Sequence, residues 1–389
     1  MRIPVWALVF GLICVFGSAC GALPAAPPEP EYEVSSAPVE PPEGAGSASD
    51  EPPETADSAS AEPPETADSA SAEPPETAGS ASAEPFPHPG YSTTGPAALG
   101  TYDRDACIRV GSLNTGILGG TKQSRTHTFG VLASVVTNFD ILALQEVGNN
   151  SSIVFSANSD KNAASVMNAY IARVNALADG HPSLGPYAYV RAHQYAYVYR
   201  VNAVTISGEQ WLSDRMDTFT YAPHAAKFTS AAAPGFSFVL VNIHTSPGKA
   251  KTEIPAISRL MNDMAAHYGE EKVSCLGDYN ADSAGTNYYV SGSAAQGWLN
   301  GFSPPDWFTV IPNGTDTTVA AQVNAYDRIQ LSSSLARYST GTWGVIRWAE
   351  YTDVTLCEGT GTPGGSGTFG TERALSDHFP VWAEFRLPE

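Results

Sequence analysis

Basic side chains are scarce in this chain of 389 residues. Twenty Lys and Arg face 40 Asp and Glu, which gives a formal net charge of −20. The imbalance is uneven, because residues 21–99 hold 15 acidic side chains and no Lys or Arg, whereas residues 100–389 hold 25 acidic against 19 basic. This balance weighs against a protein that charge alone steers to nucleic acid, since such proteins normally carry a basic face.

Cysteine is also rare, with five in the whole chain. Cys14 and Cys20 lie in a predicted leader, so Cys107, Cys275 and Cys357 remain for the folded part. In an oxidising compartment an odd count allows one disulfide and one free thiol. The pair considered is Cys107 with Cys357, and Cys275 is interpreted as a small buried residue of an apolar strand.

The first residues lack a run long enough to span a membrane. An apolar stretch from Val5 to Phe16 follows Arg2 and gives way to small residues before Cys20, which predicts a cleaved signal peptide at residues 1–20. Residues 17–20 also resemble a bacterial lipobox, in which Cys20 carries the lipid. We therefore expect an exported protein, either a cell-surface lipoprotein whose membrane contact is this anchor or a plainly secreted one.

Residues 21–99 consist largely of Pro, Glu, Ala and Ser, with an eleven-residue unit repeated from Glu51. Such a composition cannot bury a core, and proline together with like charge keeps the segment extended. We expect a disordered acidic linker that acts as a spacer. Residues 100–389 remain for one domain, which is long enough for a well-buried core.

Apolar runs of strand length dominate residues 100–389. Strands are predicted at 108–113, 140–145, 187–191, 195–200, 236–243, 272–276, 328–331 and 381–387, and helices at 126–137 and 251–267. Strands and helices are mixed rather than strictly alternating, so sheets packed on one another with helices outside are expected. The Gly-rich stretch 358–370 is predicted to be a long loop.

Six short polar segments close or follow these strands. They are Leu113–Asn114, Gln145–Glu146, Asn242–His244, Gly277–Asp282, Tyr326–Ile329 and Ser376–Pro380. A fold that gathers strand ends at one sheet edge would bring two imidazoles, several carboxylates and two carboxamides together. Oxygen ligands for a hard divalent cation and histidines that move protons are the groups that phosphodiester hydrolysis needs.

The carboxylates in these segments each have a structural alternative. Glu146 ends an apolar strand, where a carboxylate has no packing role and a metal ligand is the economical interpretation, although a helix cap or an ion pair is the alternative. Asp278 and Asn280 are two residues apart and can face one small volume to bind metal or a phosphoryl oxygen, whereas the alternative is an Asx-rich surface turn.

The two histidines differ in their surroundings. His244 follows an apolar strand and would, if considered alone, be interpreted as a satisfied interior residue. His378 follows Asp377, so that one side chain can bind metal while the other moves protons. Asp327 can orient a histidine by accepting its second N–H, as an aspartate does in a catalytic triad, or it can pair with a neighbouring arginine. The joint occurrence of these residues in one order favours the catalytic interpretation.

At these residues the chain resembles the DNase I-like branch of the endonuclease/exonuclease/phosphatase superfamily, over most of residues 108–387. Residues 195–200, 242–248 and 324–329 are similar to DNase I itself, and Ser376–Pro380 is shared across the superfamily. The resemblance implies a four-layered α/β/β/α sandwich of two mixed, mainly antiparallel sheets. It also implies hydrolysis of phosphodiesters with Mg²⁺ or Mn²⁺, assisted by Ca²⁺.

The resemblance further implies a role for each site residue. The metal ligands would be Asn114, Glu146 and Asp377. The acid and base would be His244 and His378, with Asp327 orienting His378. Asp278 and Asn280 would hold metal or phosphate, and the residues that contact substrate would be Asn280, Arg191 and Tyr195.

Some positions depart from the DNase I pattern. The glutamate that DNase I pairs with the histidine matching His244 is His193 here, beside Gln194, so His244 is expected to lack its carboxylate support. Gly148 stands in place of one DNA-contacting arginine, and a second is replaced near Tyr221. Ser283 and Asn324 occupy the region of a missing disulfide. The chemistry is thus expected to be retained more fully than the DNA contacts.

The sequence therefore predicts an exported, monomeric, metal-dependent endonuclease that acts on DNA. One alternative is a phosphodiesterase or phosphatase acting on lipid headgroups or small phosphate esters, which the shortage of basic side chains would suit. The other is a non-catalytic surface binding module that kept the fold, and the intact set of motifs argues against it.

Overall fold

The computed structural model describes residues 99–148, 157–181, 183–212, 218–282, 307–321, 323–359 and 371–389. The predicted leader, nearly all of the predicted linker, Ser283 and most of the Gly-rich stretch lie outside these residues, so what was expected of them stays a prediction. In the described part of the chain, no helix has the length and apolar character needed to cross a membrane.

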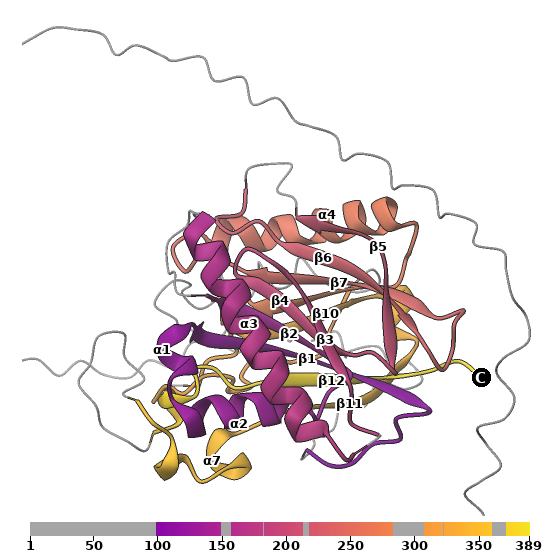
Figure 1. Ribbon diagram of the computed structural model, residues 1–389. Helices are drawn as coiled ribbons and strands as arrows, with labels where there is room; N and C mark the ends of the chain where they lie inside the picture. The colour runs from indigo at the N-terminus through magenta and orange to yellow at the C-terminus, as the bar shows by residue number, and fades with distance from the viewer. Residues whose placement is uncertain are drawn as a thin grey trace, which may run out of the picture. The chain divides into compact units, whose positions relative to one another are not determined.

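The described strands form two sheets of six strands each (Figure 1). The first sheet has the order β11-β12-β1-β2-β4-β3, and its strands are β1 Cys107–Leu118, β2 Ile141–Val147, β3 Tyr187–Ala192, β4 Tyr195–Arg200, β11 Ser339–Val345 and β12 Val381–Arg386. The second has the order β5-β6-β7-β8-β10-β9, with β5 Val204–Leu212, β6 His224–Ser230, β7 Ser237–His244, β8 Val273–Asp278, β9 Trp307–Thr309 and β10 Asp327–Ser332.

Each sheet has one parallel pair at its centre, β1 with β2 and β7 with β8. The other neighbouring strands run antiparallel. The two sheets are therefore mixed and mainly antiparallel, as predicted. The central strands are buried along nearly their whole length because both faces of each sheet are covered.

Three apolar clusters separate four layers. Alternate residues of β2 point to opposite faces, so that Ile141 joins the cluster between the sheets while Leu142 packs under the helices of the first sheet. These helices are α2 Thr126–Val136 and α3 Ala157–Ala178. Helix α4 Ala250–Tyr268 covers the outer face of the second sheet, against a cluster that includes Val241. The predicted α/β/β/α sandwich is confirmed.

Short elements complete the described part. They are α1 Gly120–Gln123, α6 Ser333–Ala336, α7 Trp348–Tyr351 and the 3₁₀ turns Val354–Leu356 and Glu372–Ala374. The predicted strands and both predicted helices are present, with ends shifted by a few residues. Sequence analysis missed α3, β5, β6, β9 and β11. Helix α3 is rich in Ala and Asn, and Asn is a weak helix former, so its stability comes from packing against the sheet.

The three cysteines of the domain are free thiols, which contradicts the disulfide considered between Cys107 and Cys357. Cys107 begins β1 and pairs with Arg386 of β12, whereas Cys357 is buried in the cluster under α2 and α3. Cys107 thus belongs to a strand of the first sheet, and Cys357 to the apolar cluster between that sheet and its covering helices. Cys275 is buried in β8, as expected.

Gly277 allows the close approach of the two parallel strands of the second sheet. It pairs with Ile243 and has a φ of +145°. A Cβ added there would stand 1.9 Å from the carbonyl oxygen of Ile243, so no side chain fits without displacing the backbone. Gly277 is therefore needed for the pairing of β7 with β8 beside Asp278.

We expect Gly277→Ala to lower the free energy of unfolding by about 3 kcal/mol or more, because it combines backbone strain with a clash against backbone. Urea unfolding followed by tryptophan fluorescence measures the change. Gly235→Ala is the matched control, since among the described residues, its chain neighbours aside, no atom lies within 4 Å of the new Cβ, and it should change stability by less than about 0.5 kcal/mol. Equal unfolding midpoints for the two variants would contradict this account of Gly277.

Candidate active site

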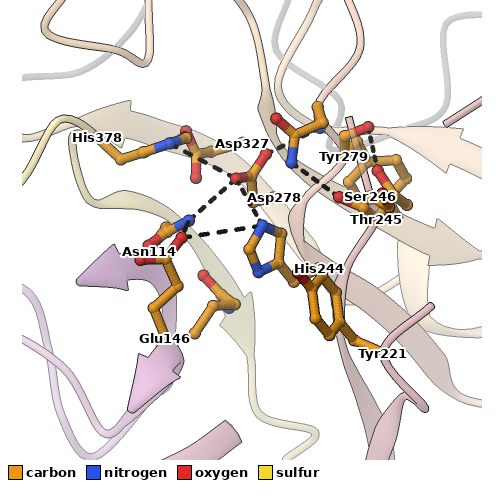
Figure 2. Close-up of polar contacts among 12 residues, drawn as sticks. Asn114, Glu146, Tyr221, His244, Thr245, Ser246, Asp278, Tyr279, Asp327 and His378 are labelled. Atoms are coloured by element: carbon orange, nitrogen blue, oxygen red, sulfur yellow. Dashed lines mark hydrogen bonds and ion pairs between the residues drawn. The ribbon is translucent and has the colours of Figure 1, made fainter. Parts of the chain in front are cut away.

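The carboxyl ends of the two parallel strand pairs supply four of the predicted site residues. In the first sheet Asn114 of β1 lies opposite Gln145 of β2, one residue before Glu146. In the second sheet His244, the last residue of β7, lies opposite Asp278, the last residue of β8. Parallel strands end at the same edge of a sheet, and the two edges face each other across the sandwich (Figure 2).

Antiparallel neighbours begin where these strands end, and they add the remaining groups. Asp327 is the first residue of β10 and pairs with Asp278. Asp377 and His378 come directly before β12, whose first residue, Val381, pairs with Ser112 of β1. The mixed topology therefore brings strand ends and strand beginnings to one place.

A buried polar contact joins the two sheets beneath this site. The amide nitrogen Nε2 of Gln145 donates to Oδ1 of Asn242 at 2.7 Å. Asn242 donates in turn to the carbonyl oxygen of Leu144 at 3.0 Å. Both amide side chains are fully buried. Because a hydrogen bond is directional, this pair sets the position of Glu146 relative to His244.

His378 is held by hydrogen bonds on its ring and on its backbone. Its Nδ1 lies 2.8 Å from Oδ2 of Asp327, which is fully buried, and its Nε2 lies 3.5 Å from Oδ2 of Asp278. Its backbone N–H donates to the hydroxyl of Ser376, and its carbonyl accepts from the indole of Trp348. Burial alone would lower the pKa of His378, but the carboxylates of Asp327 and Asp278 outweigh it and hold the pKa well above its usual value.

His244 approaches the same carboxylate from the other sheet. Its Nε2 lies 3.5 Å from Oδ2 of Asp278 and 4.0 Å from Oε1 of Glu146. Its backbone N–H donates to the hydroxyl of Tyr195 at 3.1 Å. The ring of Tyr221 stacks on the imidazole, with centroids 5.1 Å apart and planes 24° apart, as Figure 2 shows. The stacking on Tyr221 sets the orientation of the imidazole plane, and the backbone bond to Tyr195 sets its position along the strand.

The Nδ1 atom of His244 lies 3.2 Å from Oε1 of Gln194. In the resemblance to DNase I, His193 stands at the position of the supporting glutamate, but the structure turns His193 outward and Gln194 inward. The cause is the tight turn between β3 and β4, in which His193 has a φ of +49°. In the described part of the chain, the group at this nitrogen is therefore a carboxamide.

Asp278 lies at the centre of these contacts. Its Oδ2 faces both imidazoles and accepts a hydrogen bond from the amide of Asn114 at 3.0 Å. Its Oδ1 accepts the backbone N–H of Asn280 at 2.8 Å. The side-chain amide of Asn280 donates to the carbonyl of Thr245, so this residue ties the loop after β8 to the loop after β7. Asn280 has a φ of +44°, which asparagine tolerates better than most residues.

Glu146 also has a left-handed backbone, with a φ of +58°, and its side chain is 28% exposed. Such strain in a residue other than glycine is typical of functional sites. Its Oε1 accepts from Nδ2 of Asn114 at 3.1 Å, while Oδ1 of Asn114 accepts the backbone N–H of Gly116. Asn114 therefore turns its donor atom toward the carboxylates, and its amide would have to rotate before its oxygen could bind a metal.

Asp377 lies beside the turn that follows Asn114. Its Oδ1 is 3.1 Å from the position that a Cβ on Gly116 would occupy, and Gly116 has a φ of +54°. Among the described residues, no three His, Cys, Asp or Glu side chains are already arranged as a metal-binding group. The carboxylates of Glu146 and Asp377 both lie close enough to the ammonium group of Lys122 to act on its charge.

Lys122 is a site residue that sequence analysis missed. Its ammonium group is buried and donates hydrogen bonds to the carbonyl oxygens of Thr115, Gly116 and Leu375. Burial lowers the pKa of Lys122 to about 8, against the opposing pull of the carboxylates of Asp377 and Glu146. A lysine in a short polar stretch gives no sequence signal of burial, because only the fold brings the three carbonyls around it.

The remaining two residues expected at the substrate lie on the hairpin of β3 and β4. Arg191 donates to the carbonyl oxygen of His193 at 3.1 Å and is partly exposed near the site. Tyr195 is fully buried, so its ring offers no surface on which substrate can lie. Its hydroxyl instead supports His244, which corrects the expected role.

No protein-family model matches the chain. Deoxyribonuclease-1 of Gallus gallus is 28% identical over 287 residues, which cover 71% of this chain and 91% of that protein. Deoxyribonuclease-1-like 2 of Mus musculus is 28% identical over 296 residues, with 74% and 95% covered. Deoxyribonuclease-1-like 1 of Homo sapiens is 27% identical over 293 residues, with 72% and 85% covered. These similarities confirm the resemblance to the DNase I-like branch and support a phosphate-ester hydrolase as the class of protein.

Solved structures also align with the chain. An endonuclease/exonuclease/phosphatase family protein from Bacteroides thetaiotaomicron has a TM-score of 0.47 and 16% identity, covering 73% of this chain and 98% of that one. A mannosyl-6-phosphatase from the same bacterium has a TM-score of 0.42 and 15% identity, covering 71% and 98%. The assignment of the fold rests on the two sheets and four layers themselves.

We expect Lys122→Met to lower the free energy of unfolding by about 2 to 4 kcal/mol, because three buried carbonyl oxygens lose their donor. Chemical unfolding at neutral pH measures the change. Lys251→Met is the control, since Lys251 is an exposed residue of α4, and it should have little effect. Equal losses for the two variants would show that the Lys122 ammonium does not hold these carbonyls.

Proposed function

We propose that the chain is an exported, monomeric, metal-dependent endonuclease that hydrolyses phosphodiester bonds of DNA. The observation that carries the proposal is the position of Oδ2 of Asp278, which lies 3.5 Å from Nε2 of both His244 and His378. Phosphodiester hydrolysis takes a proton from the attacking water and gives one to the leaving oxygen. Two imidazoles on two sides of one carboxylate meet that need.

DNA is the proposed substrate because the similar curated proteins named above are all deoxyribonucleases. The similarity spans 91% of the Gallus gallus protein and 71% of this chain, so it extends over most of the fold and is not limited to one part of it. Arg191, partly exposed on the hairpin beside Gln194, is the side chain proposed to contact the phosphate backbone.

The donor set fits a hard divalent cation. Mg²⁺ is usually held by one or two carboxylates together with water and substrate phosphate, rather than by a closed cage of protein ligands. Glu146 and Asp377 are proposed as these carboxylates, with Asn114 joining them if its amide rotates and Ca²⁺ as an assisting ion. When bound, the cation would stabilise the charge that develops on the phosphate.

The protein itself orients the groups that move protons. The bond from Asp327 to Nδ1 of His378 leaves Nε2 facing Asp278. His244 is aligned toward the same oxygen by its contacts with Tyr195 and Tyr221. Asn280 fixes the loops around Asp278 through its bond to Thr245. The reacting phosphate would therefore meet two pre-oriented rings without further rearrangement of the strands.

Export is proposed from the N-terminal sequence. Residues 1–20 have the pattern of a signal peptide, and residues 21–99 have the composition of a spacer. A lipid on Cys20 would then hold the domain at the cell surface through this spacer.

The proposal predicts that the full chain nicks supercoiled plasmid DNA in Mg²⁺ with Ca²⁺, that EDTA stops the reaction, and that excess Mg²⁺ restores it. Gel electrophoresis of plasmid forms measures this, beside parallel assays on sphingomyelin and p-nitrophenyl phosphate. Intact plasmid with hydrolysis of either other ester would favour the lipid or small-ester alternative. Intact plasmid with no ester cleaved would favour a non-catalytic binding module.

We expect His378→Ala and Glu146→Gln each to lower kcat by about 100-fold or more, since one removes a proton carrier and the other a proposed metal ligand. Initial rates of plasmid nicking measure the loss. His181→Ala is the control, because His181 is an exposed imidazole at the end of α3, and it should retain full activity. Wild-type rates for either site variant would remove that residue from the proposed machinery.

A further inference from the structure

The two histidines of the site are supported by different chemical groups. Nδ1 of His378 lies 2.8 Å from a carboxylate oxygen of Asp327, whereas Nδ1 of His244 lies 3.2 Å from the carboxamide oxygen of Gln194. Asp327 is fully buried and Gln194 is 5% exposed, so water does not replace either partner easily. The Nδ1 atom of His378 therefore contacts a carboxylate, whereas the Nδ1 atom of His244 contacts a neutral amide group.

The first sheet fixes the position of Gln194. Its backbone carbonyl oxygen accepts the N–H of Val147 at 2.9 Å, which ties the turn between β3 and β4 to the residue after Glu146. His244 comes from the second sheet. The contact between Gln194 and His244 therefore spans the sandwich, and it couples the histidine to the strand end that carries Glu146.

The amide of Gln194 does little for stability. Its Nε2 atom is buried and has no hydrogen-bond partner among the described residues. A buried amide group left unpaired costs about 1 to 3 kcal/mol. The bond from Oε1 to His244 is the one side-chain hydrogen bond found for Gln194 in the described part of the chain. A buried glutamine whose one side-chain bond goes to a histidine is better explained by its effect on that histidine than by a contribution to stability.

We infer that Gln194 is the positioning residue for His244, and that its Oε1 keeps a hydrogen on Nδ1 so that proton exchange takes place only at Nε2. Nε2 is the nitrogen that faces Asp278 and Glu146. A carboxamide achieves this without adding another negative charge to a site that already gathers several carboxylates. The inference rests on the proposed function for its effect on turnover, but the state of the ring is independent of turnover.

The activity test compares Gln194→Leu with Gln194→Glu in the full chain. Loss of a supporting hydrogen bond behind a functional histidine typically costs about 10- to 100-fold, so Gln194→Leu should lower kcat by that factor with little change in KM. Gln194→Glu keeps an acceptor oxygen and should recover most of the lost rate. In a His244→Ala background, Gln194→Leu should cause no further loss, because it acts through the missing ring.

A matched control separates positioning from packing. Gln330 is a second buried glutamine whose Oε1 is bonded and whose Nε2 has no partner among the described residues, but its bond is to Thr309 at the far edge of the second sheet. Gln330→Leu should leave kcat unchanged. Gln194→Leu should keep or raise the melting temperature, since it removes an unpaired buried amide, whereas a merely structural role would lower it.

The state of the ring is measured by nitrogen NMR of the full chain labelled with ¹⁵N in histidine, with the His244 signals identified by their absence in His244→Ala. We expect Nδ1 to carry the hydrogen in the wild type and Gln194→Glu, and the hydrogen to spread to Nε2 in Gln194→Leu. An unchanged spectrum in Gln194→Leu, or a wild-type hydrogen on Nε2 alone, would overturn the inference. If the chain cleaves no phosphodiester, the proposed function fails while the spectra still decide the role of Gln194.

Discussion

The hydrogen bond between Gln145 and Asn242 is the contact on which the site depends. Apolar packing between the sheets is not directional, so by itself it leaves their relative position loosely specified. The Gln145 amide meets Asn242 at 2.7 Å, and Asn242 returns a bond to Leu144. These residues come immediately before Glu146 and two residues before His244. A shift of one sheet against the other would break a buried polar pair and separate the two halves of the site.

Charge is the second constraint on the site. Several carboxylates lie close together, and they are balanced by the two imidazoles, the amide of Asn114 and the buried ammonium of Lys122. Burying like charges together is costly unless donors surround them or a cation joins them. The raised pKa of His378 shows that these carboxylates favour positive charge in the site, and the left-handed backbone of Glu146 is a separate local strain. Both are expected where binding of a cation or a phosphate, rather than stability, has shaped the residues.

Much of the fold could be predicted because most of the central strands contain apolar runs of strand length that end in polar residues. The same pattern did not reveal α3, whose Asn-rich sequence becomes helical through packing on the sheet. It also misplaced the support of His244, because a left-handed turn at His193 reverses which of two neighbouring side chains points inward. Lys122 and the buried Tyr195 were beyond prediction for a similar reason, since each owes its role to groups distant in the chain.

The sequence by itself determined which chemical groups stand at the strand ends and in what order, since strand periodicity and polar termini are local properties. It also determined the uneven charge between the acidic N-terminal segment and the domain. Only the tertiary structure decided that Asp278 stands between the two imidazoles, that Gln194 rather than His193 supports His244, and that Lys122 is buried among carbonyls. These are contacts between segments far apart in the chain, and their geometry depends on how two twisted sheets pack, which no local pattern encodes.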